Sequence, residues 1–262
     1  MKHTTVRVSA IAAGVLAAGI GLALPFVQTI AAQTTELRVL CSNAVKAAVE
    51  ELRPQIERSV GRRLAIQFDS SQRLRQKIDA GEPFDVAFLG SEMIDELIQK
   101  GTIAAGSRAD IGRTGVGVGV RAGARKPDVS TPEALKQTLL NAKSITMNPT
   151  GASFTHFNRI AGQLGIAEDV KTKLILDPQP GRPQMNVAEG KAELVWTQIP
   201  EIRSVPGLEL AGALPAALQS YTAFAVGAAT KTNSAGAAAA LIKFITAPAA
   251  IATFRAKDVE AR

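Results

Sequence analysis

The sequence predicts an α/β protein built as two lobes with a cleft between them. Short apolar segments alternate with amphipathic ones up to residue 101, and a second series of the same kind follows residue 130. Such alternation implies parallel strands with helices on both faces of a sheet. Apolar strands near 115–120 and 222–226 stand between and after the two series, so we expect the chain to cross from one lobe to the other and back.

The first series repeats a strand and a helix three times. The strands are expected at 37–41, 64–68 and 84–89. Ser42 or Asn43 caps the first helix, Pro54 should kink or restart it, and Gly61 ends it. The next two helices also end at glycines, which are common just past a helix C-terminus.

The second series opens with Ser130-Thr131-Pro132-Glu133, a capping box that predicts a helix over 134–140. Before it, glycine and valine alternate over 115–120. No helix follows these glycines, so the segment indicates a crossing strand with close packing rather than a nucleotide-binding loop. The remaining strands are expected at 145–147, 174–176, 193–196 and 208–210, and the remaining helices at 154–164, 185–189 and 234–244.

The N-terminus has the pattern of a secretory signal peptide over residues 1–32. Lys2 and Arg7 precede an almost wholly apolar run that ends in small residues, so we expect cleavage after Ala31 or Ala32 and a periplasmic product. The alternative is an uncleaved anchor, but the apolar run is at the lower limit for spanning a bilayer. In the remaining chain we expect lobe 1 over 33–115 and 222–262, and lobe 2 over 116–221.

Composition argues against several classes of partner. Removal of residues 1–32 takes away two basic residues and no acid, which leaves 28 Lys and Arg against 23 Asp and Glu, a net charge of +5. The basic residues are scattered and the chain has one Trp and one Tyr, so no nucleic-acid partner is expected. A mild positive charge would help to attract a small anion. Cys41 is the only cysteine, so an internal disulfide is impossible.

The usual catalytic and metal-binding groups are sparse. His156 is the only histidine after the signal peptide and lies on an otherwise apolar segment, and Cys41 lies at the end of an apolar strand. No cluster of Cys and His has metal-ligand spacing, so we expect no metal and no cofactor. Asp69 and Asp85 are not paired by spacing, and Asp85 is expected to orient the adjacent turn. We therefore do not expect an enzyme, although the fold alone would not exclude one.

The most informative motif is the serine pair Ser70-Ser71, which follows an apolar strand and precedes a helical segment. One of the two serines can simply cap the helix. Alternatively, the pair offers hydroxyl and amide donors at the positive end of the helix, which suits an anion. The same construction recurs at Ser42-Asn43 and, more loosely, over 148–153. Because catalytic groups are sparse, this recurrence favours a site that binds an oxyanion through neutral donors.

The segment around this serine pair resembles a motif of the periplasmic molybdate-binding proteins of ABC transporters. It reads Ser70-Ser71-Gln72-Arg73-Leu74, followed by Ile78-Asp79-Ala80-Gly81-Glu82-Pro83-Phe84-Asp85-Val86. Residues 188–195 are loosely similar to a strand of that family's second lobe. The resemblance covers nearly all of the chain after the signal peptide. It implies a type II periplasmic-binding-protein fold, in which two α/β lobes hold the ligand between them.

In that family, a tetrahedral oxyanion is held by serine hydroxyls and amides of the first lobe, by amides of two loops of the second lobe and by a tyrosine hydroxyl. The resemblance implies that the ligand-binding residues here are Ser42, Asn43, Ser70, Ser71, Gly151, Ala152, Ser153, Gly181, Arg182 and Trp196. Trp196 stands where the tyrosine is expected, and an indole N–H cannot replace a hydroxyl as both donor and acceptor. The identity of the anion therefore stays open.

The function implied by the resemblance is that of a periplasmic solute-binding protein of an ABC importer. Such a protein is a monomer that captures a small oxyanion, such as molybdate or tungstate, and delivers it to a membrane permease, without being embedded in the membrane itself. Three alternatives stay open. The ligand could be another small anion such as a carboxylate, the protein could be an enzyme on the same scaffold with a titratable group in its cleft, or it could be a sensory component with a separate membrane partner.

Overall fold

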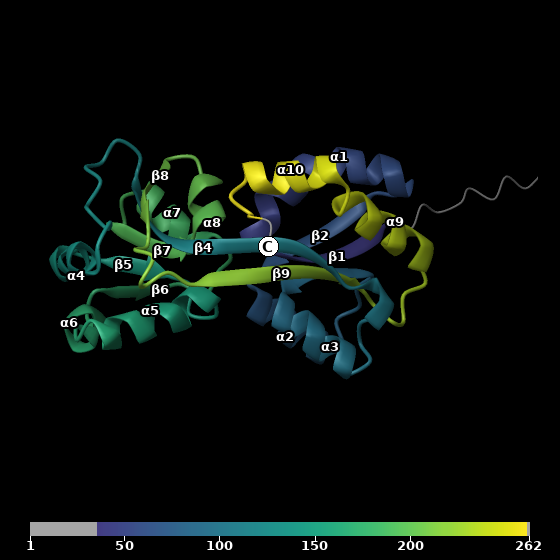
Figure 1. Ribbon diagram of the computed structural model, residues 1–262, viewed down its shortest axis with the longest axis horizontal. Coiled ribbons are helices and arrows are strands. Elements are labelled where there is room, and N and C mark those ends of the chain that lie inside the picture. The colour runs from purple at the N-terminus through teal and green to yellow at the C-terminus, as the bar shows by residue number, and fades with distance from the viewer. Residues whose placement is uncertain (1–35, 261–262) are drawn as a thin grey trace, which may run out of the picture. The chain divides into compact units, whose positions relative to one another are not determined.

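The computed structural model describes residues 36–260, which form one mixed sheet flanked by helices (Figure 1). The predicted signal peptide lies outside the described residues. The strands lie in the order β2-β1-β3-β9-β4-β7-β5-β6, and β8 pairs with β4. Strands β1, β2 and β3 are parallel to one another, as are β5, β6 and β7. The prediction of an α/β protein with two parallel series is therefore confirmed.

Every expected strand and helix has a counterpart in the structure. The strands are β1 Leu37–Ser42, β2 Leu64–Asp69, β3 Val86–Gly90, β4 Ala109–Arg121, β5 Ile145–Met147, β6 Leu174–Leu176, β7 Leu194–Gln198, β8 Leu208–Ala213 and β9 Tyr221–Ala228. The helices are α1 Lys46–Val60, α2 Ser71–Asp79, α3 Ser91–Gln99, α4 Pro132–Asn141, α5 Ala152–Gln163, α6 Ala167–Lys171, α7 Arg182–Ala188, α8 Ile199–Arg203, α9 Ala235–Ile245 and α10 Pro248–Ala256. Helices α6, α8 and α10 were not expected from the sequence; the first two are so short that no helical period can be recognised in them.

Two lobes are built on this sheet. Lobe 1 contains β1, β2 and β3, with α1, α9 and α10 packed on one face and α2 and α3 on the other (Figure 1). Lobe 2 contains β5 to β8, with α4, α5 and α6 on one face and α7 and α8 on the other. The long strands β4 and β9 pair antiparallel and run from one lobe into the other (Figure 1). Strand β4 places Ile111 in the core of lobe 1 and Val118 in the core of lobe 2. The residue boundaries given above for the lobes stay a prediction.

The glycine–valine alternation belongs to the crossing strand β4, as expected. A Cβ atom at Gly119 would lie 2.7 Å from Val195 Cγ1 and 2.9 Å from Ile202 Cγ2, and one at Gly117 would lie 2.8 Å from Leu210 Cδ1. Real Cβ atoms do not approach neighbours this closely, so only glycine lets α8 and β8 pack against this strand. The glycines therefore serve packing and hold α8 close to the sheet.

Pro54 does not interrupt the first helix, so the restart considered above does not occur. Helix α1 runs without interruption from Lys46 to Val60 with Pro54 inside it. Pro54 is exposed, so the carbonyl that loses its helical partner can be hydrated. The opposite face buries Leu52 and Ile56, and this packing keeps the helix continuous.

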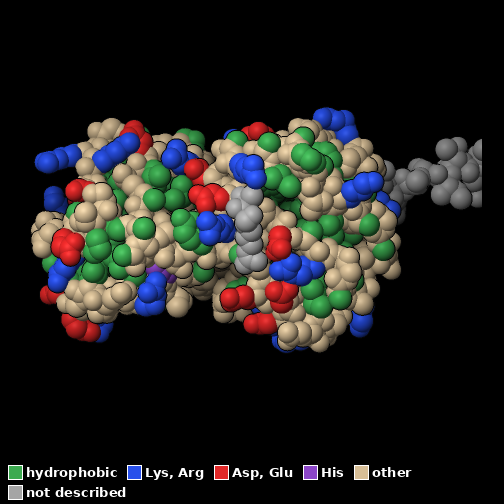
Figure 2. Space-filling model, in the orientation of Figure 1, with side chains coloured by type: hydrophobic (Ala, Val, Ile, Leu, Met, Phe, Trp, Pro, Cys, Tyr) green, Lys and Arg blue, Asp and Glu red, His purple; other side chains and the backbone are tan. Residues whose placement is uncertain are grey.

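The distribution of charge on the surface and the length of the helices bear on possible charged patches and membrane spans. Figure 2 shows acidic and basic side chains interspersed over the viewed face, with no extended patch of one sign. Among residues 36–260, no single helix is long and apolar enough to cross a membrane; α9 and α10 meet that criterion only together, across a bend of 65°.

Candidate functional site

The carboxyl ends of the parallel strands of both lobes meet at a cleft of about 550 Å³. Lobe 1 contributes the segments that follow β1, β2 and β3, and lobe 2 contributes those that follow β5, β6 and β7. The first residues of β9 line the cleft between them. Ligands of open α/β sheets bind beyond the carboxyl ends of the strands, so this cleft is the candidate site.

The cleft brings together most of the residues expected from the sequence. Eight of the ten line it, namely Ser42, Asn43, Ser70, Ser71, Gly151, Ala152, Ser153 and Gly181. Arg182 and Trp196 are not among the lining residues. The Arg182 guanidinium instead pairs with the Glu189 carboxylate at 3.2 Å.

Trp196 lies in the core of lobe 2 and has 0% exposure. Its indole N–H donates to the backbone oxygen of Ser153 at 3.0 Å, and its ring packs edge-on against Phe157 with centroids 5.1 Å apart. Trp196 therefore holds the start of α5, which lines the cleft, and does not itself reach the cleft.

Ser70 has the capping role considered above. Its Oγ accepts from the backbone N–H of Arg73 at 3.3 Å and lies 3.0 Å from Thr150 Oγ1 on lobe 2. The Thr150 hydroxyl donates to Asn148 Oδ1 at 2.8 Å, so the proton between Ser70 and Thr150 comes from Ser70. Ser70 thus caps α2 and links the two walls of the cleft.

Ser71 is available to a ligand in a way that Ser70 is not. Its Oγ accepts from the backbone N–H of Gly90 at 3.2 Å, which fixes the oxygen and leaves the hydroxyl proton free. Ser91 also lines the cleft; it is buried, and its hydroxyl has no partner among the described residues. Buried polar atoms without a partner are uncommon, and a bound ligand is one way of satisfying them. The wall formed by lobe 1 is therefore rich in neutral donors.

One side chain of the lobe 2 wall was not expected from the sequence, and it carries a carboxyl group. Glu201, in the first turn of α8, lines the cleft and is partly buried. Its Oε2 accepts from the Gln184 amide at 2.8 Å and from the Thr197 hydroxyl. Burial raises the pKa of the Glu201 carboxyl, although these two hydrogen bonds oppose the rise. A usable signal was present, because Thr197 and Gln198 end a strand and a helix begins directly after them, as at Ser70-Ser71.

The cleft has no basic side chain among its described lining residues, and its charged ones are Glu92 and Glu201. Glu92 is exposed on α3. Tyr221 adds a phenol from β9, and its ring lies 4.2 Å from the guanidinium carbon of Arg113. An anion in this cleft would be held by hydroxyls and amides, with a carboxyl group facing part of it.

Cys41 and His156, the sparse catalytic-type residues noted in the sequence, are both buried. Cys41 is fully buried, and its thiol contacts the Ser42 carbonyl at 3.6 Å; burial raises its pKa. His156 is buried, with Nε2 at 2.9 Å from the Leu218 carbonyl, and burial lowers its pKa. Neither lines the cleft, so neither is placed to react with a ligand there. No group of three or more His, Cys, Asp and Glu residues in the described part of the chain could hold a metal ion.

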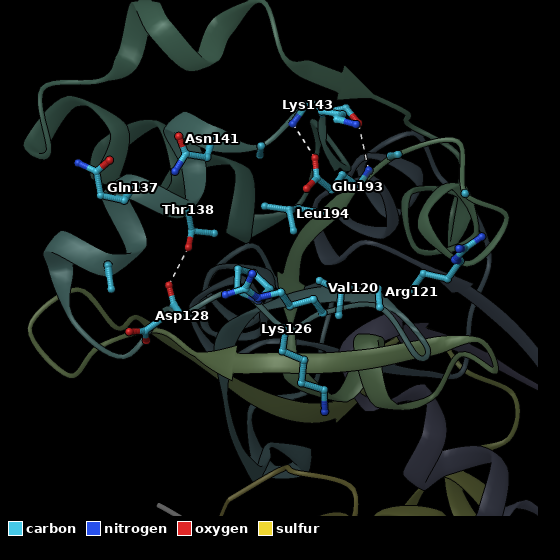
Figure 3. Close-up of a pocket in the computed structure, with 18 of the residues that line it drawn as sticks. Val120, Arg121, Lys126, Asp128, Gln137, Thr138, Asn141, Lys143, Glu193 and Leu194 are labelled. Atoms are coloured by element: carbon cyan, nitrogen blue, oxygen red, sulfur yellow. Dashed lines mark hydrogen bonds between the residues drawn. The ribbon is translucent and has the colours of Figure 1, made fainter.

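A second and larger cavity, of about 1050 Å³, lies at the other end of the lobe 2 strands, where β4 ends and β5 and β7 begin (Figure 3). It mixes basic residues such as Arg121 and Lys126 with the acids Asp128 and Glu193. The Glu193 carboxylate accepts from the Lys143 backbone N–H at 2.6 Å (Figure 3). None of the residues expected from the sequence lines this cavity, so the candidate site remains the cleft.

Comparison with known proteins places the chain in a family. Residues 37–257 match the family described as bacterial extracellular solute-binding protein. The chain is 32% identical over 220 residues to an aconitate isomerase of a Pseudomonas species, covering 80% of this chain and 82% of that protein. It is 26% identical over 174 residues to the molybdate-binding protein ModA of Azotobacter vinelandii, covering 66% of this chain and 68% of that protein.

A solved structure supports the same conclusion. The chain is similar to the periplasmic molybdate-binding protein of Azotobacter vinelandii, with a TM-score of 0.72 and 19% identity, over 85% of this chain and 97% of that one. The expected type II periplasmic-binding-protein fold and the resemblance to molybdate-binding proteins are thereby confirmed. The chain belongs to the family of bacterial extracellular solute-binding proteins.

Proposed function

We propose that this protein is a periplasmic component of an ABC importer, which captures a small organic carboxylate between its lobes and delivers it to a membrane permease. The observation that carries the choice of ligand is Glu201, a partly buried carboxyl group in a cleft whose described lining has no basic side chain and is rich in neutral donors. The sequence left both an oxyanion such as molybdate and a carboxylate open.

Cleft size supports an organic ligand. A volume of about 550 Å³ falls within the roughly 300–1,000 Å³ of sites for small organic molecules. A five-atom oxyanion would fill only a small part of this space and would leave much of the wall without contacts. Trp196, at the position of the family's tyrosine, is buried in the core and offers no hydroxyl to such an ion, so the phenol of the cleft comes instead from Tyr221 on β9.

Charge supports the same choice. A fully ionised tetrahedral oxyanion carries no proton, so it cannot donate a hydrogen bond to Glu201 Oε1. Two unit charges of the same sign about 4 Å apart repel by about 4 kcal/mol at an effective dielectric constant of about 20. An organic acid can bind its carboxylates at the hydroxyls of lobe 1 and place its C–H or O–H groups against Glu201.

One of the two relatives is consistent with a carboxylate ligand. By its name, the relative with 32% identity acts on aconitate, a tricarboxylate, whereas the relative with 26% identity binds molybdate. A second candidate function, an enzyme on the binding-protein scaffold, is favoured by Glu201. The alternative of an enzyme requires a titratable group in the cleft, and Glu201 is such a group.

Isothermal titration calorimetry with a panel of anions tests the proposal. The panel contains trans-aconitate, citrate, malate, molybdate, tungstate, sulfate and phosphate. We expect at least one organic acid to bind more tightly than every inorganic oxyanion. Tighter binding of molybdate or tungstate than of all the organic acids would contradict the carboxylate assignment and favour the oxyanion.

A further inference from the structure

Hydrogen bonds to one of its two carboxyl oxygens orient the Glu201 side chain. Oε2 accepts from the Thr197 hydroxyl and from Gln184 Nε2 at 2.8 Å, and both donors come from neighbouring elements of lobe 2, β7 and α7. Gln184 is itself 6% exposed, so its amide is held in place by packing. No hydrogen bond to Oε1 is formed within the described residues. The carboxyl group is therefore fixed in direction while one oxygen stays available.

This arrangement is costly for a cleft that only binds anions. Among residues 36–260, the lining offers no Lys or Arg to neutralise Glu201, and an ionised Glu201 repels an anionic ligand. A neutral side chain at this position would avoid the repulsion. A carboxyl group in such a place has a use if it exchanges a proton with the ligand.

General acid–base catalysis requires a group that is positioned within hydrogen-bond reach and has a pKa shifted toward the working pH. Partial burial moves the pKa of Glu201 in that direction. The opposite wall supplies what the reaction would need, because the free proton of Ser71 and the unpartnered hydroxyl of Ser91 can stabilise negative charge that develops on a ligand carboxylate.

We propose that Glu201 is a catalytic acid–base residue that moves a proton between two carbons of a bound unsaturated carboxylate, an inference that rests on the proposed carboxylate ligand. Glu201 Oε1 takes a proton from a methylene group that lies between a carboxylate and a C=C bond. The electron pair of the broken C–H bond forms a new C=C bond to the neighbouring carbon. The electrons of the old double bond then take the proton from Glu201, so that a new C–H bond forms at the carbon of that double bond farther from the methylene group. One C–H bond breaks and another forms, the double bond shifts, and no oxidant, reductant or co-reactant is needed.

Hydrogen–deuterium exchange followed by proton NMR tests the inference, with trans-aconitate in D₂O as the probe. At a saturating concentration, the wild-type protein should replace the methylene hydrogens of trans-aconitate with deuterium and form its double-bond isomer. Glu201→Gln keeps an oxygen that accepts from Thr197 and Gln184 but cannot take a proton. Its exchange rate at saturation should fall about 100-fold or more, because general acid–base catalysis contributes about 10²–10⁴-fold.

A matched control is Glu133→Gln, which removes an exposed acid of α4 that does not line the cleft and should leave exchange within about twofold of wild type. Calorimetry on each variant gives the concentration needed for saturation and separates affinity from catalysis. Binding of trans-aconitate without exchange in the wild type, or undiminished exchange in Glu201→Gln, would overturn the catalytic role while leaving the binding function intact. No binding of trans-aconitate or any other organic acid by the wild type would refute the proposed function as well.

Discussion

Ser71 is the cleft residue whose contribution to binding can be worked out most directly from its surroundings. The backbone N–H of Gly90 holds Ser71 Oγ at 3.2 Å, so the hydroxyl donates outward without losing its own structural contact. Ser71→Ala removes one hydrogen bond to a charged ligand. Such a bond contributes about 1.5–3 kcal/mol. Because 1.4 kcal/mol corresponds to a factor of ten, the dissociation constant should rise about 10- to 150-fold.

The same substitution also leaves the Gly90 N–H without its partner, so stability has to be measured beside affinity. We expect the free energy of unfolding of the ligand-free protein to fall by about 0.5–1.5 kcal/mol in urea denaturation. Ser107→Ala is the matched control, because Ser107 Oγ likewise accepts a backbone N–H, that of Ala228 at 2.9 Å, but does not line the cleft. It should lose at least as much stability, because Ser107 Oγ also donates to the Ala104 carbonyl at 2.6 Å, and should keep wild-type affinity.

Calorimetry with the tightest ligand of the anion panel measures both variants. Unchanged affinity in Ser71→Ala would remove Ser71 from the site. An equal loss of affinity in Ser107→Ala would mean that the weakening arises from general destabilisation, and the reasoning from the free hydroxyl proton would be refuted.

Two further predictions concern the framework of the site. Gly119→Val should lower the free energy of unfolding by about 1–3 kcal/mol in urea, because its Cβ would lie 2.7 Å from Val195 Cγ1; wild-type stability would contradict the packing role of this glycine. Asp85 is buried, and although burial acts to raise its pKa, hydrogen bonds from Arg38 and Thr232 hold that pKa below its usual value. Its contribution to stability is therefore fully present above the unfolded pKa near about 4 and is lost as pH falls through the lower, folded value. Asp85→Asn should reduce stability at pH 7 by about 1.5–3 kcal/mol and flatten its decline in acid, and an unchanged acid decline in urea or thermal unfolding would contradict this.

The strand–helix order and the crossing strands could be predicted from the sequence because they leave local signals. Ser70 is an example: an apolar run that stops at a hydroxyl residue before a helical period predicts a strand, a cap and a helix, and all three are present. The cap also helped to predict where the cleft lies, because strand-to-helix turns lie close together at the carboxyl ends of parallel strands.

The depth at which a side chain lies could not be predicted from local signals. Trp196 follows an apolar strand in either case, and only the packing of α5 against β7 decides that its ring is buried against Phe157 and not exposed to the cleft. Glu201 is in the opposite situation. Its sequence neighbours indicate a short helix at most, and its role depends on Gln184, which is distant in the chain and joins it only in the folded lobe.

Pro54 shows a third kind of limit, in which a strong local rule was overridden. A proline inside a helix lacks one hydrogen bond, but its exposed position lets water replace the lost partner while the buried face of α1 holds the helix together. Tertiary packing therefore decides whether such a residue interrupts a helix.

Competition followed by native mass spectrometry tests the central claim, that the cleft takes a small organic carboxylate, most directly. The protein is first measured as purified and then after incubation with equal concentrations of trans-aconitate, citrate, malate and molybdate. We predict a one-to-one complex whose added mass is that of an organic acid. In Ser71→Ala, the fraction of the protein found in this complex should fall. A complex with molybdate alone would contradict the claim.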